Sequence, residues 1–185
     1  MFEYCISNTT KHKAKISEGY IRSPMNYIGG KYKLLPQILP LFPQNIDTFV
    51  DLFCGGCNVG INVQAKKKVF NDNLSYLIDL YNAFQMLENG EIILHIENRI
   101  NAFNLSLTNE KGYKNLRKLY NTERNPLDLF VLVAYSFNHQ IRFNNSHEFN
   151  NPFGRERSSF NPKMRANLQT FLDSLHSDNI KFQCS

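Results

Sequence analysis

The sequence predicts an α/β fold built on a small parallel sheet. Thr48–Phe53 is a short apolar run of the kind that forms a buried strand, and a glycine turn follows it. Lys68–Asn71 is a second short strand, and it ends at Asp72. Because Val59–Gln64 between them has a helical pattern, the order strand, turn, helix, strand indicates the basic unit of an α/β sheet.

The composition supports a globular domain. The chain has 185 residues, of which 42% are hydrophobic and 20% charged, whereas disordered chains are poorer in apolar residues. It carries 21 Lys and Arg against 16 Asp and Glu, a formal charge of +5 that permits a polyanionic partner. No apolar run suits a membrane span or a secretory signal, so no membrane partner is expected. Four cysteines do not make a disulfide scaffold, and a reducing cytoplasm is the expected location.

The chain before the first predicted strand contains little regular structure. Residues 1–21 are polar and unpatterned, which predicts a loose N-terminal leader. Lys33–Phe42 has apolar residues at helical spacing, but Pro36 and Pro40 fall within it and weaken the helix.

Beyond Asp72 the apolar spacing becomes helical. Four helices are predicted with no strand between them: Leu74–Leu87, Ile92–Phe103, Tyr113–Tyr120 and Leu127–Phe137. Asn125-Pro126 opens the last of these as an N-cap followed by proline at the first helical position. A run of helices within an α/β pattern predicts an inserted helical subdomain.

The C-terminal third returns to the α/β pattern. Asn138–Gly154 is polar and rich in amides, with Asn144-Asn145 as a turn signal, and it predicts a β-hairpin. Asn161-Pro162 caps a further helix that runs to about His176, and Ile180–Gln183 begins one more strand. Since two or three strands make an incomplete sheet, the chain is expected to stop within the fold.

The glycine turn is the sharpest candidate site. Asp51 ends one strand, Gly55 and Gly56 let the backbone approach a ligand, and the following helix N-terminus favours anionic groups. Asp72 stands where nucleoside-binding α/β sites place the acid that holds ribose hydroxyls. The alternative is a structural turn with a solvated Asp. No GxxxxGK[ST] motif is present, which argues against a P-loop NTPase.

The cysteines and histidines do not predict a metal site or a catalytic nucleophile. Cys54 and Cys57 form a CxxC pair, but Cys5 and Cys184 stand singly near the two ends, so a four-ligand zinc site is not expected. The pair is better explained as small residues that pack a turn. The five histidines match no metal or catalytic spacing, and no metal is predicted.

The predicted hairpin has the composition of a DNA-contacting segment. Its candidate contacts are Asn138, Gln140, Arg142, Asn144, Asn145, Arg155 and Arg157. Asn, Gln and Arg are the side chains that read base edges with two hydrogen bonds, and Phe143, Phe149 and Phe153 lie among them as apolar anchors. The alternative is a solvated loop rich in turn formers.

Four motifs together carry a family resemblance. The chain has NYIGGK at 26–31, FVDLFCGG at 49–56, FND at 70–72 and, after an Arg-bearing segment, FNNPFG at 149–154. In this order and spacing they resemble the Dam-type, class D12 DNA adenine-N6 methyltransferases, and the phage-borne branch most of all. The resemblance covers about residues 22–185.

The resemblance implies an incomplete Rossmann-like sheet of the S-adenosylmethionine-dependent methyltransferases. Residues 22–75 would form its cofactor-binding part, 76–159 a helical DNA target-recognition insertion with a hairpin, and 160–185 the truncated return. The implied S-adenosylmethionine-binding residues are Tyr27, Lys31, Asp51, Phe53, Cys54, Gly55 and Asp72. The implied contacts to double-stranded DNA are Asn138, Gln140, Arg142, Asn144, Pro152, Arg155 and Arg157. The expected recognition sequence is GATC.

Three departures from the family pattern stand out. Cys57 replaces a glycine of the turn, and His147 replaces a common hairpin glycine. The family's catalytic Asp-Pro-Pro-Tyr, which holds the N6 amino group and stacks on a flipped adenine, is absent from these 185 residues. The expectation is therefore the N-terminal part of an adenine-N6 methyltransferase, inactive alone and without catalytic residues of its own.

Two rival functions remain open. One is a truncated DNA-binding relative, or one subunit of a split methyltransferase whose separate chain supplies the catalytic motif. The other is an unrelated α/β nucleotide enzyme, which would place Tyr27 and Lys31 away from the glycine turn. A cognate restriction enzyme is a further expected partner.

Overall fold

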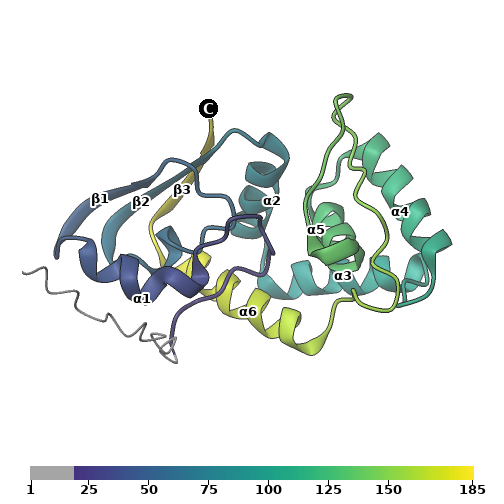
Figure 1. Ribbon diagram of the computed structural model, residues 1–185, viewed down its shortest axis with the longest axis horizontal. Coiled ribbons are helices and arrows are strands. Elements are labelled where there is room, and N and C mark those ends of the chain that lie inside the picture. The colour runs from purple at the N-terminus through teal and green to yellow at the C-terminus, as the bar shows by residue number, and fades with distance from the viewer. Residues whose placement is uncertain (1–18) are drawn as a thin grey trace, which may run out of the picture.

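The computed structural model describes residues 19–185, and most of the leader predicted at residues 1–21 lies outside that range. Within it, a small sheet lies on one side of the molecule and a group of helices on the other (Figure 1). The mixed α/β class predicted from the sequence is confirmed.

The sheet consists of three parallel strands. They are β1 (Ile46–Asp51), β2 (Ala65–Asp72) and β3 (Ile180–Cys184), in the spatial order β1-β2-β3. The predicted strands are present, although β1 begins and ends two residues earlier than predicted and β2 extends beyond both of its predicted ends. Because parallel strands share one carboxyl edge, the ends of β1 and β2 bring two carboxylates to the same edge of the sheet.

The segment before β1 is helical but broken. It comprises η1 (Tyr32–Leu34), α1 (Leu35–Ile38) and η2 (Leu39–Leu41). Pro36 and Pro40 each lie within the first two positions of a helical piece, where a missing N–H leaves no hydrogen bond unmade. The prolines therefore divide the predicted helix into short turns.

The helix predicted at Val59–Gln64 is wrong. The structure has only the 3₁₀ turn η3 (Gly60–Asn62) before the chain becomes extended at Val63. A Cβ added to Gly60 would lie 2.3 Å from the Phe70 ring, so this turn lies directly against β2 and only glycine fits at its first residue. Periodicity alone could not reveal this steric limit.

The four predicted helices after β2 are confirmed. They are α2 (Ser75–Met86), α3 (Asn89–Ala102), α4 (Glu110–Glu123) and α5 (Pro126–Tyr135). Every residue of α5 after its N-terminal proline is buried, and α2, α3 and α4 all pack against it. The apolar sequence of α5 is thus explained by its central place among the helices.

The predicted hairpin contains no regular strand. After η4 (Phe137–His139) the chain runs out and back with two isolated antiparallel bridges, Ser136 to Phe153 and Phe143 to Phe149. Side-chain bonds replace ladder bonds at its base, where the Asn151 amide donates to the carbonyls of Phe137 and Gln140. The turn predicted at Asn144-Asn145 is present.

Helix α6 (Pro162–Ser177) returns the chain to the sheet. Its N-cap is Asn161, as predicted, and it packs against α2 and α3 before β3 pairs with β2. Phe182 of β3 lies 5.1 Å from the Tyr81 ring of α2, which fixes the helical part against the sheet. None of the helices in residues 19–185 is both long and apolar enough to cross a membrane.

Two helical glycines give a test of the packing. Gly90 of α3 has open space around its Cβ position, whereas a Cβ on Gly112 of α4 would lie 2.1 Å from the Phe103 carbonyl oxygen. Gly90→Ala should raise the free energy of unfolding by about 0.4–1 kcal/mol, because it restricts the unfolded chain. Gly112→Ala should lower it by about 1–3 kcal/mol, because the α3–α4 connection must shift. Urea titrations of both variants would check the opposite signs, and an equal gain in both would contradict the packing.

Candidate functional site

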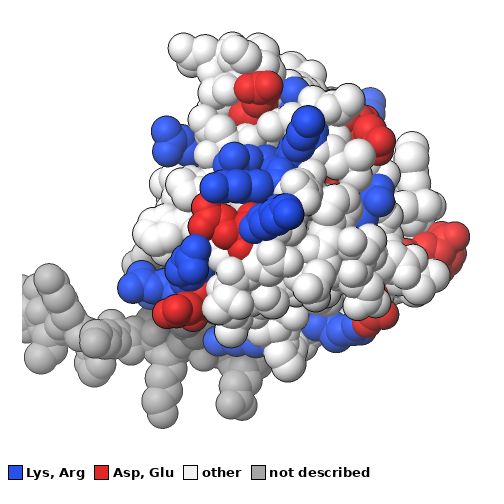
Figure 2. Space-filling view, turned by 90° about the vertical axis from the view of Figure 1, so that its right-hand side faces the viewer, with Lys and Arg blue, Asp and Glu red and all other residues white. Residues whose placement is uncertain are grey.

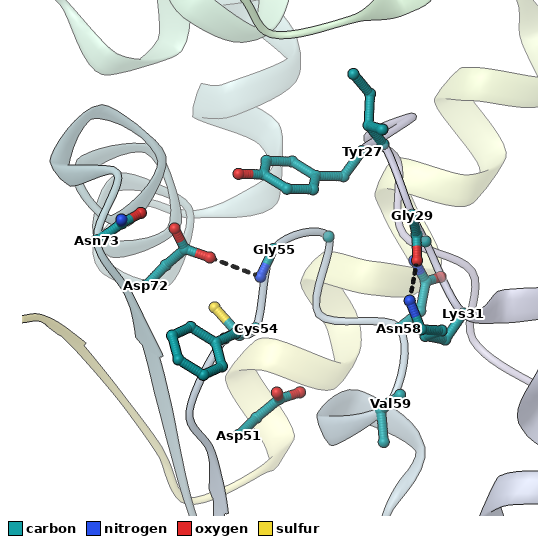
Figure 3. A pocket seen from close by; sticks show the side chains of 14 residues that line it. Tyr27, Gly29, Lys31, Asp51, Cys54, Gly55, Asn58, Val59, Asp72 and Asn73 are labelled. Atoms are coloured by element: carbon teal, nitrogen blue, oxygen red, sulfur yellow. Dashed lines mark hydrogen bonds between the residues drawn. The ribbon is translucent and has the colours of Figure 1, made fainter.

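A cavity of about 530 Å³ opens at the carboxyl edge of the sheet. It is formed by the segment around residues 27–31, the glycine turn and the end of β2, and Figure 3 shows the side chains that line it. All seven residues that the sequence assigned to one ligand lie on its wall: Tyr27, Lys31, Asp51, Phe53, Cys54, Gly55 and Asp72. The fold therefore brings together three segments that are far apart in the sequence, at residues 27–31, 51–59 and 72–73.

Asp72 joins the parts of the site. Its Oδ2 accepts from the backbone N–H of Gly55 at 2.9 Å, and its Oδ1 accepts from that of Leu74 at 3.0 Å. The side chain is buried, with 5% of its residue surface exposed. A carboxylate oxygen has two lone pairs, so each oxygen keeps one for a ligand after these bonds.

The glycine turn is shaped by two tyrosines. Gly55 has a φ of 45°, and a Cβ there would lie 2.9 Å from the Tyr27 ring, so only glycine fits beneath it. From the other side, the Tyr81 hydroxyl donates to the Gly55 carbonyl at 2.7 Å. Tyr81 was not identified from the sequence, where it reads only as an apolar position on a helical face.

The charged groups of the cavity influence one another. Burial, followed by the Asp72 and Cys54 charges, raises the pKa of Tyr27. Burial also raises the pKa of Asp51, and the nearby Asp72 adds to the rise, although the Gly60 N–H donates to Asp51 at 3.2 Å and opposes it. The wall is thus rich in acceptors, which suits a ligand that offers hydroxyl or ammonium donors.

The CxxC pair fits the packing interpretation. Cys54 and Cys57 are both buried, and burial raises the pKa of the Cys57 thiol well above its usual range. A thiol kept neutral in this way is a poor nucleophile and metal ligand. Within residues 19–185, no three His, Cys, Asp or Glu side chains are grouped as a metal site would require.

Lys31 and Phe53 lie at the rim of the cavity. The Lys31 ammonium donates to the Gly29 carbonyl, and the Phe53 side chain is 80% exposed, although it is a large apolar group. An exposed aromatic beside a polar cavity is available to cover a ligand ring. Asn58 also lines the cavity but was missed, because its amide oxygen is used by the distant Ser23 N–H.

The candidate contacts of the 138–157 loop divide into two groups. In one, polar groups hold the loop itself. The Asn138 carbonyl accepts from Asn26 at 2.8 Å, the Gln140 carbonyl accepts from Asn151, and the Pro152 carbonyl accepts from the Phe137 N–H. Their side chains lie at or near the surface.

The Asn144 amide serves the turn of the loop. Its oxygen accepts from the backbone N–H groups of Ser146 and Glu148, and its nitrogen donates to the Glu148 carboxylate. This geometry accounts for Asn144 without a ligand.

The arginines form the second group, and they also differ. Arg155 donates to Glu110 at 2.8 Å, and Glu110 is shared with Lys114 at 2.7 Å. Among the described residues, Arg142 and Arg157 are exposed and form no ion pair. They are the two loop arginines whose charge is not already compensated.

Helix α4 extends this cationic surface. The side of the molecule where α4 lies faces the viewer in Figure 2, and Lys and Arg side chains gather on it around a smaller acidic group. Lys111, Lys114 and Lys118 share one exposed helical face. The sequence predicted a helix here but no DNA contact from it.

Comparison with known proteins gives a consistent result. A family model described as D12 class N6 adenine-specific DNA methyltransferase matches residues 27–185. The type II methyltransferase M.FokI of Planomicrobium okeanokoites is 49% identical over 189 residues, which cover 99% of this chain and 29% of that protein. The modification methylase StsI of Streptococcus sanguinis is 55% identical over 163 residues, 88% of this chain and 25% of that protein.

More distant similarity extends to a shorter relative. The DNA adenine methylase of Escherichia coli (strain K12) is 29% identical over 167 residues, which cover 88% of this chain and 57% of that protein. The chain therefore spans less than a third of the two type II relatives and somewhat more than half of the adenine methylase.

The raised pKa of Asp51 predicts that its charged carboxylate lowers the free energy of unfolding at neutral pH. A carboxyl whose pKa is higher in the folded chain costs stability at neutral pH, and this cost disappears as the pH falls below the unfolded value. Asp51→Asn should therefore raise the unfolding free energy at pH 7, and the gain should shrink toward pH 4. The matched control is Asp47→Asn, an exposed residue of the same strand. Urea titrations across this range would check it, and a gain that grows with acidity would contradict the assignment.

Proposed function

The chain belongs to the D12 class N6 adenine-specific DNA methyltransferases, and we propose that it contributes the cofactor site and DNA-recognition elements of such an enzyme. The observation that supports this most is the shared cavity, which collects all seven predicted cofactor residues within or beside the matched region. The rival hypothesis of an unrelated nucleotide enzyme did not predict that Tyr27 and Lys31 line the same cavity as Asp72.

The residues of the cavity fit S-adenosylmethionine. Asp72 keeps free lone pairs for two ribose hydroxyls, and Tyr27 and Phe53 offer ring surface to an adenine. Because Gly55 has no Cβ to strike the Tyr27 ring, its backbone can lie at the cavity wall, where it could meet the methionine end. When bound, S-adenosylmethionine would supply an electrophilic methyl group on its sulfonium. The acceptor-rich wall near Asp51 and Cys54 would orient it.

Residues 76–159 would form the DNA-recognition part. The 138–157 loop presents Arg142 and Arg157 with uncompensated charge, and arginine reads guanine with two hydrogen bonds or contacts a phosphate. The lysines of α4 would add phosphate contacts. GATC is the first sequence to test. The chain is more similar to M.FokI and StsI than to the E. coli adenine methylase. Duplexes with other short sequences should therefore be tested beside GATC.

Catalysis itself would need groups that residues 1–185 do not contain. Adenine N6 is a poor nucleophile because its lone pair is delocalised into the ring. In-line methyl transfer to a flipped adenine requires acceptors that hold the amino group and an aromatic that holds the base. No Asp or Asn followed by two prolines occurs in the sequence. Other residues of a longer protein, or a separate chain, would supply them, and a cognate restriction enzyme would be the functional partner.

The cofactor assignment predicts the effect of one substitution. Asp72→Ala should weaken S-adenosylmethionine binding by about 1–3 kcal/mol, or about 5- to 150-fold, because charge-assisted bonds to the ribose are lost. Asp47→Ala removes an exposed carboxylate of the same sheet and should leave binding unchanged. Calorimetry on both variants, with circular dichroism as a check of folding, would measure this. Unchanged affinity in a folded Asp72→Ala chain would refute the role.

The division of labour predicts binding without turnover. Purified chain, labelled S-adenosylmethionine and duplexes with or without GATC should give cofactor and DNA binding but no multiple turnover at adenine N6. Methylated products would be located by sequencing that detects N6-methyladenine. Sustained transfer by the chain alone would show that the Asp-Pro-Pro-Tyr groups are not required, and absence of both kinds of binding would remove the proposed function itself.

A further inference from the structure

The 138–157 loop is attached to the body differently on its two sides. On the returning side, the Asn121 amide of α4 accepts from the Phe149 N–H at 2.8 Å and donates to the Phe149 carbonyl at 3.1 Å. On the outgoing side, Phe143 makes a backbone bridge to Phe149. Its ring stacks on Tyr76 of α2, with ring centres 4.4 Å apart and planes 20° from parallel. Backbone bonds tie the outgoing side to the returning side, from the Asn150 N–H to the Arg142 carbonyl at 3.0 Å and from the Asn144 N–H to the Glu148 carbonyl at 2.9 Å. Its contact with α2 is the aromatic stack.

The Tyr76 ring is itself held by a cation. The Arg124 guanidinium carbon lies 5.2 Å from its centre and 5.5 Å from the centre of the Tyr120 ring. Within the described residues Arg124 forms no ion pair, and its Nη1 is buried without a hydrogen-bond partner. The aromatic faces are therefore its main neighbours, and a cation between two rings is attracted to both. The Tyr76 ring is therefore held on one side by Arg124, at the C-terminal end of α4, and on the other by Phe143 of the loop.

The stacked ring determines where its neighbour points. In an extended segment adjacent side chains alternate between two faces. Phe143 is half-buried against Tyr76, whereas Arg142 is exposed. Asn144, on the other side of Phe143, is engaged in the turn. Any rotation of Phe143 about the loop axis would consequently swing Arg142 away from its present direction.

Tyr76 also lies close in the chain to the cofactor cavity. Asp72 accepts from the Leu74 N–H at 3.0 Å, and α2 begins at Ser75. The carboxylate at the cavity and the ring under the loop are thus separated by a single hydrogen-bonded turn. Because this connection is short and hydrogen-bonded, it keeps the distance between the cavity and the loop constant.

We propose that Tyr76 is a positioning residue for sequence recognition, which holds Phe143 so that Arg142 meets the DNA at a fixed place relative to the cofactor cavity. This inference rests on the proposed function, because it assumes that the 138–157 loop contacts DNA. Tyr76 itself touches neither partner in this assignment. Its loss should therefore remove selectivity while it leaves the general attraction to DNA and the cofactor cavity intact.

The test uses the full chain and duplexes with a randomised central segment. Bound duplexes are sequenced to measure the enrichment of preferred sequences, and bulk affinity is measured over a range of salt concentrations. Tyr76→Ala should lower the enrichment roughly 5- to 150-fold, the range of one two-bonded base contact. Bulk affinity, its salt slope and S-adenosylmethionine affinity should change little, because no phosphate contact is removed.

Three further variants control the test. Tyr76→Phe keeps the ring and should keep the enrichment. Phe42→Ala removes a partly buried aromatic from an edge-to-face pair with Phe49 of β1, and should destabilise the chain without changing selectivity. Should Tyr76→Ala fail to fold, Phe143→Leu keeps the apolar volume but loses the stack, and it should show the same loss of selectivity.

The outcomes separate this inference from the proposed function. Arg142→Ala should lose selectivity as Tyr76→Ala does. If Arg142→Ala loses it but folded Tyr76→Ala and Phe143→Leu keep it, the positioning role is wrong and the DNA assignment stands. If the unaltered chain and Arg142→Ala show equal enrichment, Arg142 does not read the sequence and the positioning role fails, whereas the proposed function fails only if cofactor binding and DNA binding are both absent. A parallel loss in Phe42→Ala would also overturn the role, since selectivity would then follow stability.

Discussion

The Asp72 carboxylate is the constraint on which the rest of the molecule depends. It stands at the last residue of β2, and its two oxygens accept from the N–H of Gly55 and from that of Leu74. One bond closes the glycine turn over the end of the sheet, and the other holds the backbone of Leu74, the residue just before α2. A buried carboxylate is costly unless such donors satisfy it, so the turn and the helix start stabilise the charge as much as the charge stabilises them.

Contacts that begin at the glycine turn place the remaining elements. The Gly55 carbonyl, fixed by the turn, accepts from the Tyr81 hydroxyl of α2, and Tyr81 stacks on Phe182 of β3. The third strand and the helical part are thereby held to the same corner as the cavity. The start of α2 also directs Tyr76 to the loop. A single side chain thus relates the cavity to the surface that carries Arg142 and Arg157.

The sequence predicted the features that depend on local chemistry. Asn125-Pro126 and Asn161-Pro162 start helices because an amide caps the free N–H groups and proline needs no donor, and both signals were correct. Features that depend on a distant neighbour were missed. The turn at Gly60 is limited by Phe70, and Tyr81 matters because of the Gly55 carbonyl. Asp51, Gly55 and Asp72 were identified from the glycine turn and the strand ends, and the other four predicted residues of the cavity came from the family resemblance.

Two of the three departures from the family pattern, Cys57 and His147, have a common structural explanation. Cys57 has a φ of 57° and His147 a φ of 60°, the left-handed region in which glycine is favoured. A side chain there costs roughly 1–2 kcal/mol. Backbone bonds close both turns, from the Cys57 N–H to the Cys54 carbonyl and from the His147 N–H to the Asn144 carbonyl. The backbone conformation is therefore what both turns require, and glycine is only its least costly residue. A missing glycine in either motif does not by itself argue against the turn or the site it forms.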